Sequence, residues 1–200
     1  MRLMLQKSLR APVTRIITPI CRGLLKAGLT ANAVSTLGAA GSVISAIYFY
    51  SRGEFLIGTI ATVVFALSDL LDGTMARLAQ TGSKWGALLD STLDRMTDSA
   101  VLGSVAYFLS KQSDRLVSVV LTALVAGGLV SYIKARAESL NIECNGGLAE
   151  RTERLIIAFL AIFLAGFSVP YALAIGMWIL CIASIYTVIE RLLIVYKGSR

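Results

Sequence analysis

The sequence predicts an all-α integral membrane protein with six transmembrane helices, preceded by an N-terminal interfacial amphipathic helix. Hydrophobic residues make up 56% of the 200 residues, and the mean hydropathy is +0.74. Soluble domains are rarely this apolar. Several uncharged runs are also long enough for the roughly 20 residues that a membrane-spanning helix needs. Composition and run length together therefore favour a polytopic membrane protein.

The basic residues are distributed unevenly along the chain. There are 19 Lys and Arg against 12 Asp and Glu, a net charge of +7. In membrane proteins such an excess usually lies in cytoplasmic loops. If both termini are cytoplasmic, only Arg52, Lys111 and Arg115 fall on the outer side. We therefore expect a multi-pass protein of the cell inner (plasma) membrane, with both termini in the cytoplasm. We expect no nucleic-acid partner, because no basic segment is rich in aromatic residues.

The first 29 residues form a basic segment without acids, in which leucines and isoleucines are interleaved. This pattern predicts an amphipathic helix on an anionic cytoplasmic leaflet rather than a disordered tail. Its apolar stretches are short and interrupted, which argues against a cleaved signal peptide. The expected organisation is a juxtamembrane segment over residues 1–29 and a six-helix membrane domain over residues 30–200.

Long apolar runs define the six expected spans, and the second and third of these spans carry acidic residues. The first four cover residues 27–51, 55–72, 85–109 and 116–133. The last run, 155–189, is about twice the length of one span. Pro170 is its expected break, so this run should supply the fifth and sixth helices as a close pair.

Four carboxylates lie in two pairs at the ends of neighbouring spans. Asp69 and Asp72 are three residues apart and Asp90 and Asp94 are four apart, so each pair shares a helix face. At a rise of about 1.5 Å per residue, Asp69 and Asp90 both lie about 9 Å inside the cytoplasmic edge of the bilayer. Two antiparallel helices would therefore bring both pairs to one level.

Buried acids of this kind need compensation, because each costs about 2.5–3.5 kcal/mol in lipid. A water-filled cavity and bound cations would both relieve that cost. The chain has no histidine and no close cysteine pair, so any metal must be held by oxygen, which favours Mg, Mn or Ca. The alternative is that the acids pair with Arg77 and Arg95 inside the helix packing, but the acids outnumber those bases.

The residues between the two pairs suit a phosphate-bearing substrate. Gly73 would let the substrate approach the backbone, and Arg77 can bind a phosphate with two parallel hydrogen bonds. A carboxylate beside a metal can also act as a general base for an attacking hydroxyl. The residues alone thus indicate metal-assisted phosphoryl transfer at the cytoplasmic membrane boundary.

The spacing of these residues resembles the signature of the CDP-alcohol phosphotransferase family. The chain contains D-x2-D-G-x2-A-R-x8-G-x3-D-x3-D from Asp69 to Asp94 without a departure. The resemblance implies a six-helix membrane enzyme, generally a homodimer, that uses Mg²⁺ or Mn²⁺. It also implies a reaction in which an acceptor alcohol displaces CMP from a CDP-linked donor.

The resemblance further implies a role for each matching residue. The metal ligands would be Asp69, Asp72, Asp90 and Asp94, with Asp94 also the catalytic base. The CDP-bearing donor would meet Asn32, Ala33, Val34, Ser35, Gly73, Arg77 and Ser83. Asp98 lies outside the signature, and either a structural ion pair or a supporting role behind the ligands is open for it.

A second basic set on the cytoplasmic side suggests that the acceptor carries its own phosphate. Its members are Lys134, Arg136, Arg151, Arg154 and Arg191. Ordinary loop charge is the alternative for any one of them. Beyond the signature, TRIITPICRGLLKAGLT, SYIKARAES and ERTERLII resemble stretches of the phosphatidylinositol-phosphate synthases of actinobacteria.

That closer resemblance implies CDP-diacylglycerol as donor and inositol 1-phosphate as acceptor. The acceptor phosphate would meet Ser131, Lys134, Arg151, Arg154 and Arg191, with less support for Arg136. Two alternatives stay open. One is a phosphatidylglycerophosphate synthase that uses glycerol 3-phosphate. The other is a carboxylate-lined divalent-cation transporter, which the placement of every intramembrane acid toward one side disfavours.

Overall fold

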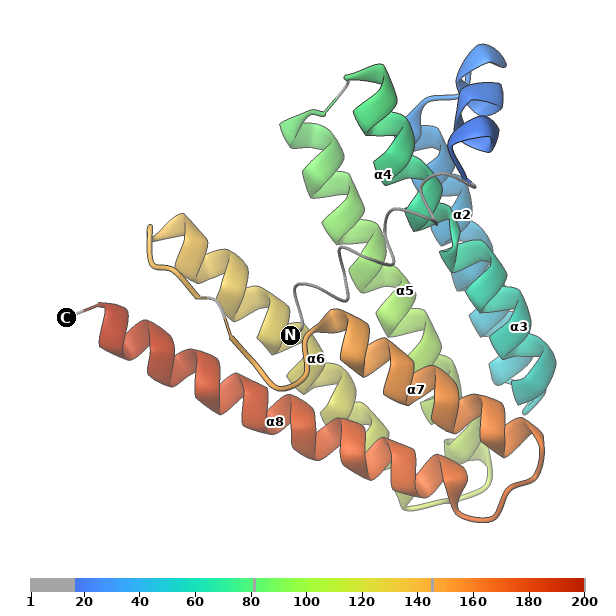
Figure 1. Ribbon diagram of the computed structural model, residues 1–200. Coiled ribbons are helices and arrows are strands. Elements are labelled where there is room, and N and C mark those ends of the chain that lie inside the picture. The colour runs from blue at the N-terminus through green and yellow to red at the C-terminus, as the bar shows by residue number, and fades with distance from the viewer. Residues whose placement is uncertain (1–16, 81, 145, 200) are drawn as a thin grey trace. The chain divides into compact units, whose positions relative to one another are not determined.

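A computed structural model describes residues 17–80, 82–144 and 146–199. Every regular element in these ranges is helical, which agrees with the predicted all-α class. A helix over residues 17–26 precedes the labelled elements. These are α2 (Ala31–Ser45), η1 (Ala46–Tyr50), α3 (Phe55–Ala66), α4 (Ser68–Ala79), α5 (Lys84–Lys111), α6 (Leu116–Ser139), α7 (Arg151–Gly166) and α8 (Ala172–Gly198) (Figure 1).

The long apolar run near the C-terminus is broken at Pro170, as predicted. α7 ends at Gly166 and α8 begins at Ala172. Ser168 and Tyr171 both have positive φ angles, 58° and 59°, in the turn between them. Backbone hydrogen bonding continues α8 beyond the uncharged residues, so that Arg191 lies on a helix rather than in a tail.

Gly73 and Arg77 lie within α4, so the helix continues past residue 72, where the second expected span ended. The helix continues to Ala79, and Gln80 ends it in the left-handed conformation, with φ at 52°. Met75, which is fully buried, anchors this last part of the helix in a small apolar cluster with Cys21 and Val34. That burial offsets the weak helix propensity of one glycine, which is about 1 kcal/mol.

Four helical stretches of the described chain are long and apolar enough to cross a membrane. They are Ala31–Tyr50, Phe55–Ala79, Leu116–Ser139 and Ala172–Gly198. α5 has 28 residues but carries ionisable groups through its first half, and α7 has 16 residues. The count of six spans is therefore not established by length and composition. Of the predicted N-terminal amphipathic helix, residues 1–16 lie outside the described residues.

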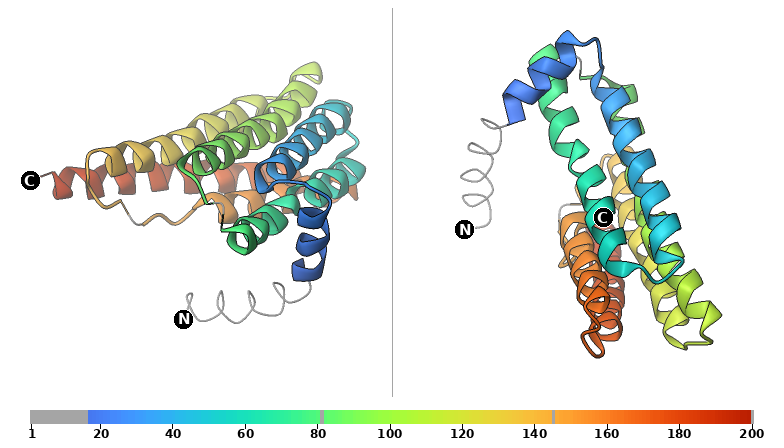
Figure 2. Two further views of the ribbon diagram at one scale, coloured as in Figure 1. Left: turned by 90° about the horizontal axis from the view of Figure 1, so that it is seen from above. Right: turned by 90° about the vertical axis from the view of Figure 1, so that its right-hand side faces the viewer.

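The chain divides into two compact units. The first comprises the residues up to Ile44 together with Ala61–Thr97. Within it α2 lies beside α4 (Figure 2), because Gly38 leaves room for the Ser68 side chain. The buried residues of this unit include Cys21, whose Sγ donates a weak hydrogen bond to the Leu71 carbonyl at 3.5 Å.

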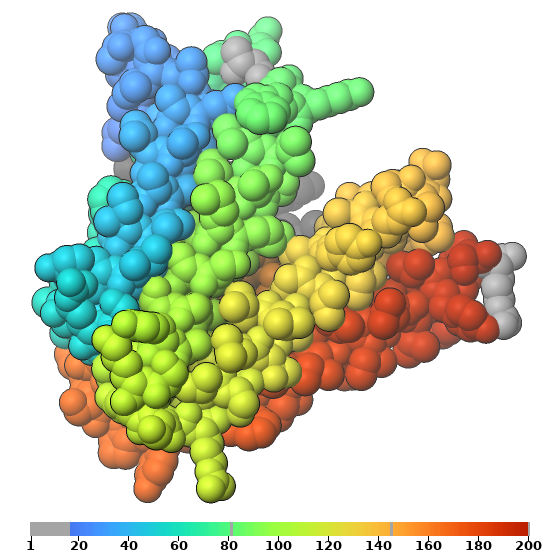
Figure 3. All heavy atoms as spheres, turned by 180° about the vertical axis from the view of Figure 1, so that it is seen from behind, coloured from blue at the N-terminus to red at the C-terminus, as the bar shows by residue number. Residues whose placement is uncertain are grey.

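The second unit comprises Ser45–Ile60 and the chain from Asp98 onward. α6 and α7 both pack against α8, and Figure 3 shows α6 in yellow along α8 in red. Its core includes Tyr50, Ile162 and Met177, each fully buried. The rings of Phe55 and Phe108 meet edge to face with centroids 5.0 Å apart.

Candidate active site

The four signature carboxylates all belong to the first unit. α4 carries Asp69 and Asp72, and α5 carries Asp90 and Asp94. Asp72 is the most enclosed, with 7% of its surface exposed, and the charges of Asp69 and Asp90 both act on it. Asp69 of α4 and Asp90 of α5 therefore both lie within electrostatic range of Asp72.

The start of α2 contributes directly to this acidic group. The Ser35 hydroxyl donates a hydrogen bond to Asp72 Oδ2 across 37 residues of sequence. Asn32 lies near the start of α5, because a Cβ built on Gly86 would be 3.2 Å from its Oδ1. Of the predicted donor-binding stretch, Val34 is buried in the apolar cluster, whereas Ala33 is half-buried on the same helix.

The other predicted donor contacts lie on α4 and just before α5. Arg77 is exposed, and its Nη2 donates to Thr74 Oγ1 at 3.0 Å, which orients the guanidinium along α4. A Cβ on Gly73 would make only an ordinary contact with Arg77 Nη1, at 3.9 Å. Ser83 caps α5, because its Oγ accepts the Gly86 N–H at 3.0 Å.

The donor set fits a hard divalent cation by its chemistry, because every candidate ligand atom is a carboxylate oxygen. In the described part of the chain, no three His, Cys, Asp or Glu side chains converge closely enough to form a ready metal cluster. Asp94 is turned toward Arg95, with 3.7 Å between Oδ2 and Nη2. Among the described residues, α4 and α5 thus carry the carboxylates without bringing three of them onto a single point.

The predicted acceptor residues all lie in the second unit, but two of them, Arg154 and Arg191, donate hydrogen bonds to backbone carbonyls. Arg191 is 3% exposed, and it donates from Nε to the Gly146 carbonyl at 3.0 Å and from Nη1 to the Val130 carbonyl at 2.7 Å. Arg154 is 7% exposed, and its Nη1 donates to the Ala149 carbonyl at 3.0 Å. These arginines secure the chain just before α7.

The remaining members of the basic set differ in their surroundings. Arg151 Nε lies 3.6 Å from Asp98 Oδ1, so Asp98 forms an ion pair with the start of α7. Lys134 is half-buried, and Ser131 donates to the Gly127 carbonyl at 3.4 Å. Arg136 is exposed and bonds to Ser139 on its own helix, which separates it from the other members.

The sequence reasoning did not find three residues that contact this basic set. Thr187 and Gly147 touch across the interface between α8 and the loop before α7, and Glu150 Oε1 lies 3.7 Å from Arg191 Nη2. The consecutive glycines, Gly146 and Gly147, were the available signal. Their φ angles are 149° and 133°, a conformation that other residues rarely adopt.

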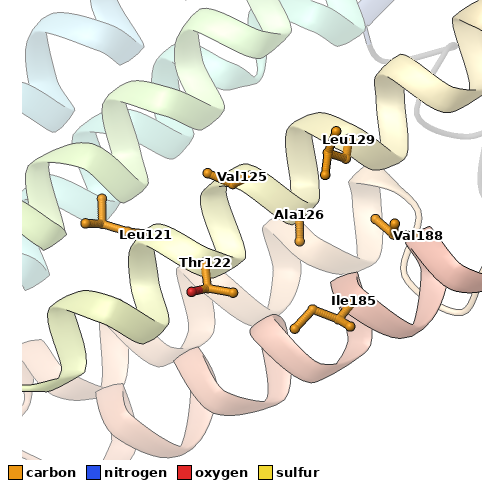
Figure 4. Close-up of a pocket in the computed structure, with 7 residues that line it drawn as sticks. All are labelled: Leu121, Thr122, Val125, Ala126, Leu129, Ile185 and Val188. Carbon is orange, nitrogen blue, oxygen red and sulfur yellow. The ribbon is translucent and has the colours of Figure 1, made fainter.

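An apolar groove with a volume of about 400 Å³ lies between α6 and α8 in the second unit (Figure 4). Its lining is aliphatic except for Thr122 and comprises Leu121, Thr122, Val125, Ala126, Leu129, Ile185 and Val188. None of the predicted site residues contributes to it.

The family model described as CDP-alcohol phosphatidyltransferase matches residues 28–189. The chain belongs to the CDP-alcohol phosphatidyltransferase family. It is therefore a phosphatidyltransferase enzyme, and the transporter hypothesis is wrong. The family agrees with the one that the signature indicated.

Relatives of this phosphatidyltransferase include named enzymes. The phosphatidylinositol phosphate synthase of Streptomyces avermitilis is 42% identical over 205 residues, which cover 98% of this chain and 84% of the relative. That of Corynebacterium glutamicum is 38% identical, covering 94% and 88%. The chain thus resembles these enzymes over nearly its whole length.

Solved structures of phosphatidylinositol phosphate synthase from Mycobacterium tuberculosis have the same fold as this phosphatidyltransferase. The structure with CDP-DAG bound is 41% identical, with a TM-score of 0.89 and coverage of 92% of this chain and 95% of that one. A second, in complex with manganese and citrate, has a TM-score of 0.87 at 40% identity.

Proposed function

We propose that this enzyme transfers the phosphatidyl group of CDP-diacylglycerol to inositol 1-phosphate, giving phosphatidylinositol phosphate and CMP. The observation that carries the proposal is the 42% identity to a phosphatidylinositol phosphate synthase across 98% of the chain. At this coverage the relationship includes both the signature carboxylates and the basic residues of the second unit.

We assign binding of the CDP-linked donor and its metal ions to residues of the first unit. Asp69, Asp72, Asp90 and Asp94 would hold Mg²⁺ or Mn²⁺, which supplies positive charge for the diphosphate and for the departing CMP. Arg77 is exposed and already oriented by Thr74, so its remaining N–H groups are available for a donor phosphate. The space around Gly73 supports the same assignment, because a glycine that is not packed against its neighbours leaves room for a ligand.

The remaining donor contacts are assigned to the start of α2 and the cap of α5. The residues in question are Asn32, Ala33, Val34, Ser35 and Ser83. Ser35 acts on Asp72 through a hydrogen bond to its carboxylate. We therefore assign Ser35 two roles: it orients Asp72, a candidate metal ligand, and it lines the donor site.

Asp94 is assigned as the general base. Its side chain is 16% exposed, and Arg95 Nη2 lies 3.7 Å from its Oδ2. A carboxylate in such a position can accept a proton from an attacking hydroxyl. An acceptor hydroxyl transfers its proton to Asp94 as its oxygen bonds to the β-phosphorus. The bond from that phosphorus to the CMP oxygen breaks in the same displacement.

The second unit is assigned the acceptor's phosphate, through Ser131, Lys134, Arg151, Arg154 and Arg191. Arg191 and Arg154 use part of their hydrogen-bonding capacity on backbone carbonyls. A guanidinium carries five N–H donors and a fixed positive charge, so it can bind backbone carbonyls and still attract a phosphate. Fixing them on the backbone holds these charges in place before the acceptor binds.

The proposed membrane arrangement has six spans, with α5 and α7 crossing in addition to the four apolar stretches. Both termini and the site residues then face the cytoplasm of a cell whose inner (plasma) membrane holds the protein. Residues 1–29 would be the juxtamembrane segment and residues 30–200 the membrane domain. The enzyme would act as a homodimer, as the resemblance implies.

A competition assay tests the proposed reaction. Purified enzyme with Mg²⁺ receives CDP-diacylglycerol and an equal mixture of inositol, inositol 1-phosphate and glycerol 3-phosphate, and the lipid product is identified by mass spectrometry. We expect phosphatidylinositol phosphate, with one CMP released per lipid formed. Phosphatidylglycerophosphate as the main product would overturn the acceptor assignment in favour of glycerol 3-phosphate. Asp94→Asn should stop CMP release while CDP-diacylglycerol still binds, and normal turnover would remove Asp94 as the base.

A further inference from the structure

Both backbone polar groups of Ala149, which lies two residues before α7, are hydrogen-bonded to side chains. Ala149 is 1% exposed. Its N–H donates to Thr187 Oγ1 at 3.1 Å, and its carbonyl accepts from Arg154 Nη1 at 3.0 Å. Because a buried backbone group is costly to leave unpaired, both bonds constrain this residue. Ala149 therefore connects α8 to the first turn of α7.

Thr187 is the α8 side of this connection. It is fully buried, and its hydroxyl donates to the Ala183 carbonyl at 2.8 Å, which leaves the oxygen lone pairs to accept from Ala149. Arg191 lies four residues later on the same face of the helix. It binds the Gly146 carbonyl, so two successive turns of α8 hold the same short piece of chain, the 146–149 segment.

The 146–149 segment packs against α8 so closely that no side chain would fit at Gly147. Gly147 has a φ of +133°, and a Cβ built on it would lie 2.6 Å from Thr187 Cγ2. Real Cβ contacts are essentially never this short, so the close approach depends on glycine. The position of the segment is thus set jointly by Gly147, Thr187 and Arg191.

We propose that Thr187 is a positioning residue for acceptor binding. It does not touch the acceptor but fixes the 146–149 segment, whose carbonyls in turn orient the guanidinium groups of Arg154 and Arg191. Without the Thr187 hydroxyl, the Ala149 N–H loses its buried partner and the segment loses its hold on α8. The two arginines then have more than one orientation available. This inference rests on the proposed function, because it takes these arginines as the acceptor's phosphate contacts.

The test compares Thr187→Val, which keeps the side-chain shape without the hydroxyl, with Thr187→Ser, which keeps the hydroxyl. In full-length enzyme in lipid nanodiscs, Thr187→Val should raise KM for inositol 1-phosphate about tenfold, the size expected for one buried hydrogen bond. The KM for CDP-diacylglycerol and kcat should stay within about twofold of wild type, because the donor residues are on other helices. Thr187→Ser should restore the acceptor KM. Gly147→Ala, which pushes the segment off α8 from the other side, should reproduce the effect of Thr187→Val.

A matched control is Ser184→Ala, one turn earlier on α8. Ser184 is also fully buried, and in the described part of the chain its hydroxyl has no hydrogen-bond partner. This variant should behave as wild type. Equal acceptor KM values for Thr187→Val and Ser184→Ala would overturn the inference, as would a Thr187→Val defect that appears in kcat and in both KM values together.

Hydrogen exchange separates this inference from the proposed function. With no substrate present, peptides containing the 146–149 segment should exchange faster in Thr187→Val than in wild type, and Thr187→Ser should restore protection. Unchanged exchange would overturn the anchoring role of Thr187. If wild type fails to use inositol 1-phosphate, the proposed function is wrong, whereas the anchoring is still decided by the exchange measurement.

Discussion

At the residue scale, the charged side chains of this enzyme divide into groups available to ligands and groups that hold the protein together. Arg77 is exposed, and its Nη2 donates to Thr74 on its own helix. Arg191 instead donates to two carbonyls from different parts of the chain, one of them 61 residues away. Asp98, whose role the sequence left open, pairs with Arg151. A basic residue near a phosphate site is therefore not necessarily a simple phosphate ligand.

Ser35 provides a test of how the carboxylates are organised. Its hydroxyl donates to the buried Asp72 carboxylate, and a hydrogen bond to a charged group contributes about 1.5–3 kcal/mol. Ser35→Ala should therefore lower kcat/KM by at least about tenfold. Steady-state CMP release over a range of Mg²⁺ concentrations provides the measurement, and the apparent affinity for Mg²⁺ should fall in parallel.

The matched control for Ser35→Ala is the next residue. Thr36 is exposed, and its hydroxyl donates at 2.8 Å to the Asn32 carbonyl within the same helix. Thr36→Ala should retain nearly full activity. If the two alanine variants are equally active, the Ser35 hydroxyl does not orient Asp72 for catalysis.

At the element scale, glycines set how closely the helices of the first unit approach. Gly38 of α2 faces Ser68 at the start of α4, and a Cβ there would clash with the Ser68 side chain and lie 3.0 Å from the Phe65 carbonyl. Small residues at helix contacts are the usual means of close packing in membrane proteins. The same helix pair brings Ser35 to Asp72, so close packing and site geometry depend on one contact.

Gly38→Ala should destabilise the protein by about 1–3 kcal/mol, because overpacking forces the helices apart. Thermal unfolding in detergent should show a Tm several degrees below wild type. Gly128→Ala is the control, because a Cβ at Gly128 on α6 meets no described atom within 4 Å. That variant should keep or slightly raise the Tm, since alanine is the better helix former. Equal Tm values for the two variants would contradict tight packing at Gly38.

At the scale of the whole molecule, orientation in the membrane follows from charge rather than from packing. In the proposed orientation the basic residues on the outer side are Arg52, Lys111 and Arg115, and the positive-inside rule is what favours cytoplasmic termini. α5 is the decisive helix for the number of spans, because its 28 residues suffice in length but include two of the candidate metal ligands, Asp90 and Asp94. A crossing by α5 requires those acids to face protein or water rather than lipid.

Cysteine labelling tests this topology directly. The native cysteines, Cys21, Cys144 and Cys181, are buried, and burial raises the pKa of the Cys21 thiol, so background reaction with maleimide should be low. In intact cells a membrane-impermeant maleimide should label Gln112→Cys and Val169→Cys. Lys197→Cys should react only after permeabilisation. Failure to label Gln112→Cys from outside would mean that α5 does not cross, and six spans would be wrong.

Local patterns in the sequence were sufficient for the fold class, the break at Pro170 and the family. These depend on hydrophobic run length, on a residue that cannot continue a helix and on the spacing of carboxylates along one helix face. The tertiary structure decided that Gly73 and Arg77 lie within α4 and that Arg154 and Arg191 hold backbone carbonyls. It also brought Thr187 to Ala149, 38 residues apart. Such contacts form because a buried backbone N–H or carbonyl needs a hydrogen-bond partner. The partner can come from a distant segment, and the periodicity of the sequence does not indicate which segment that is.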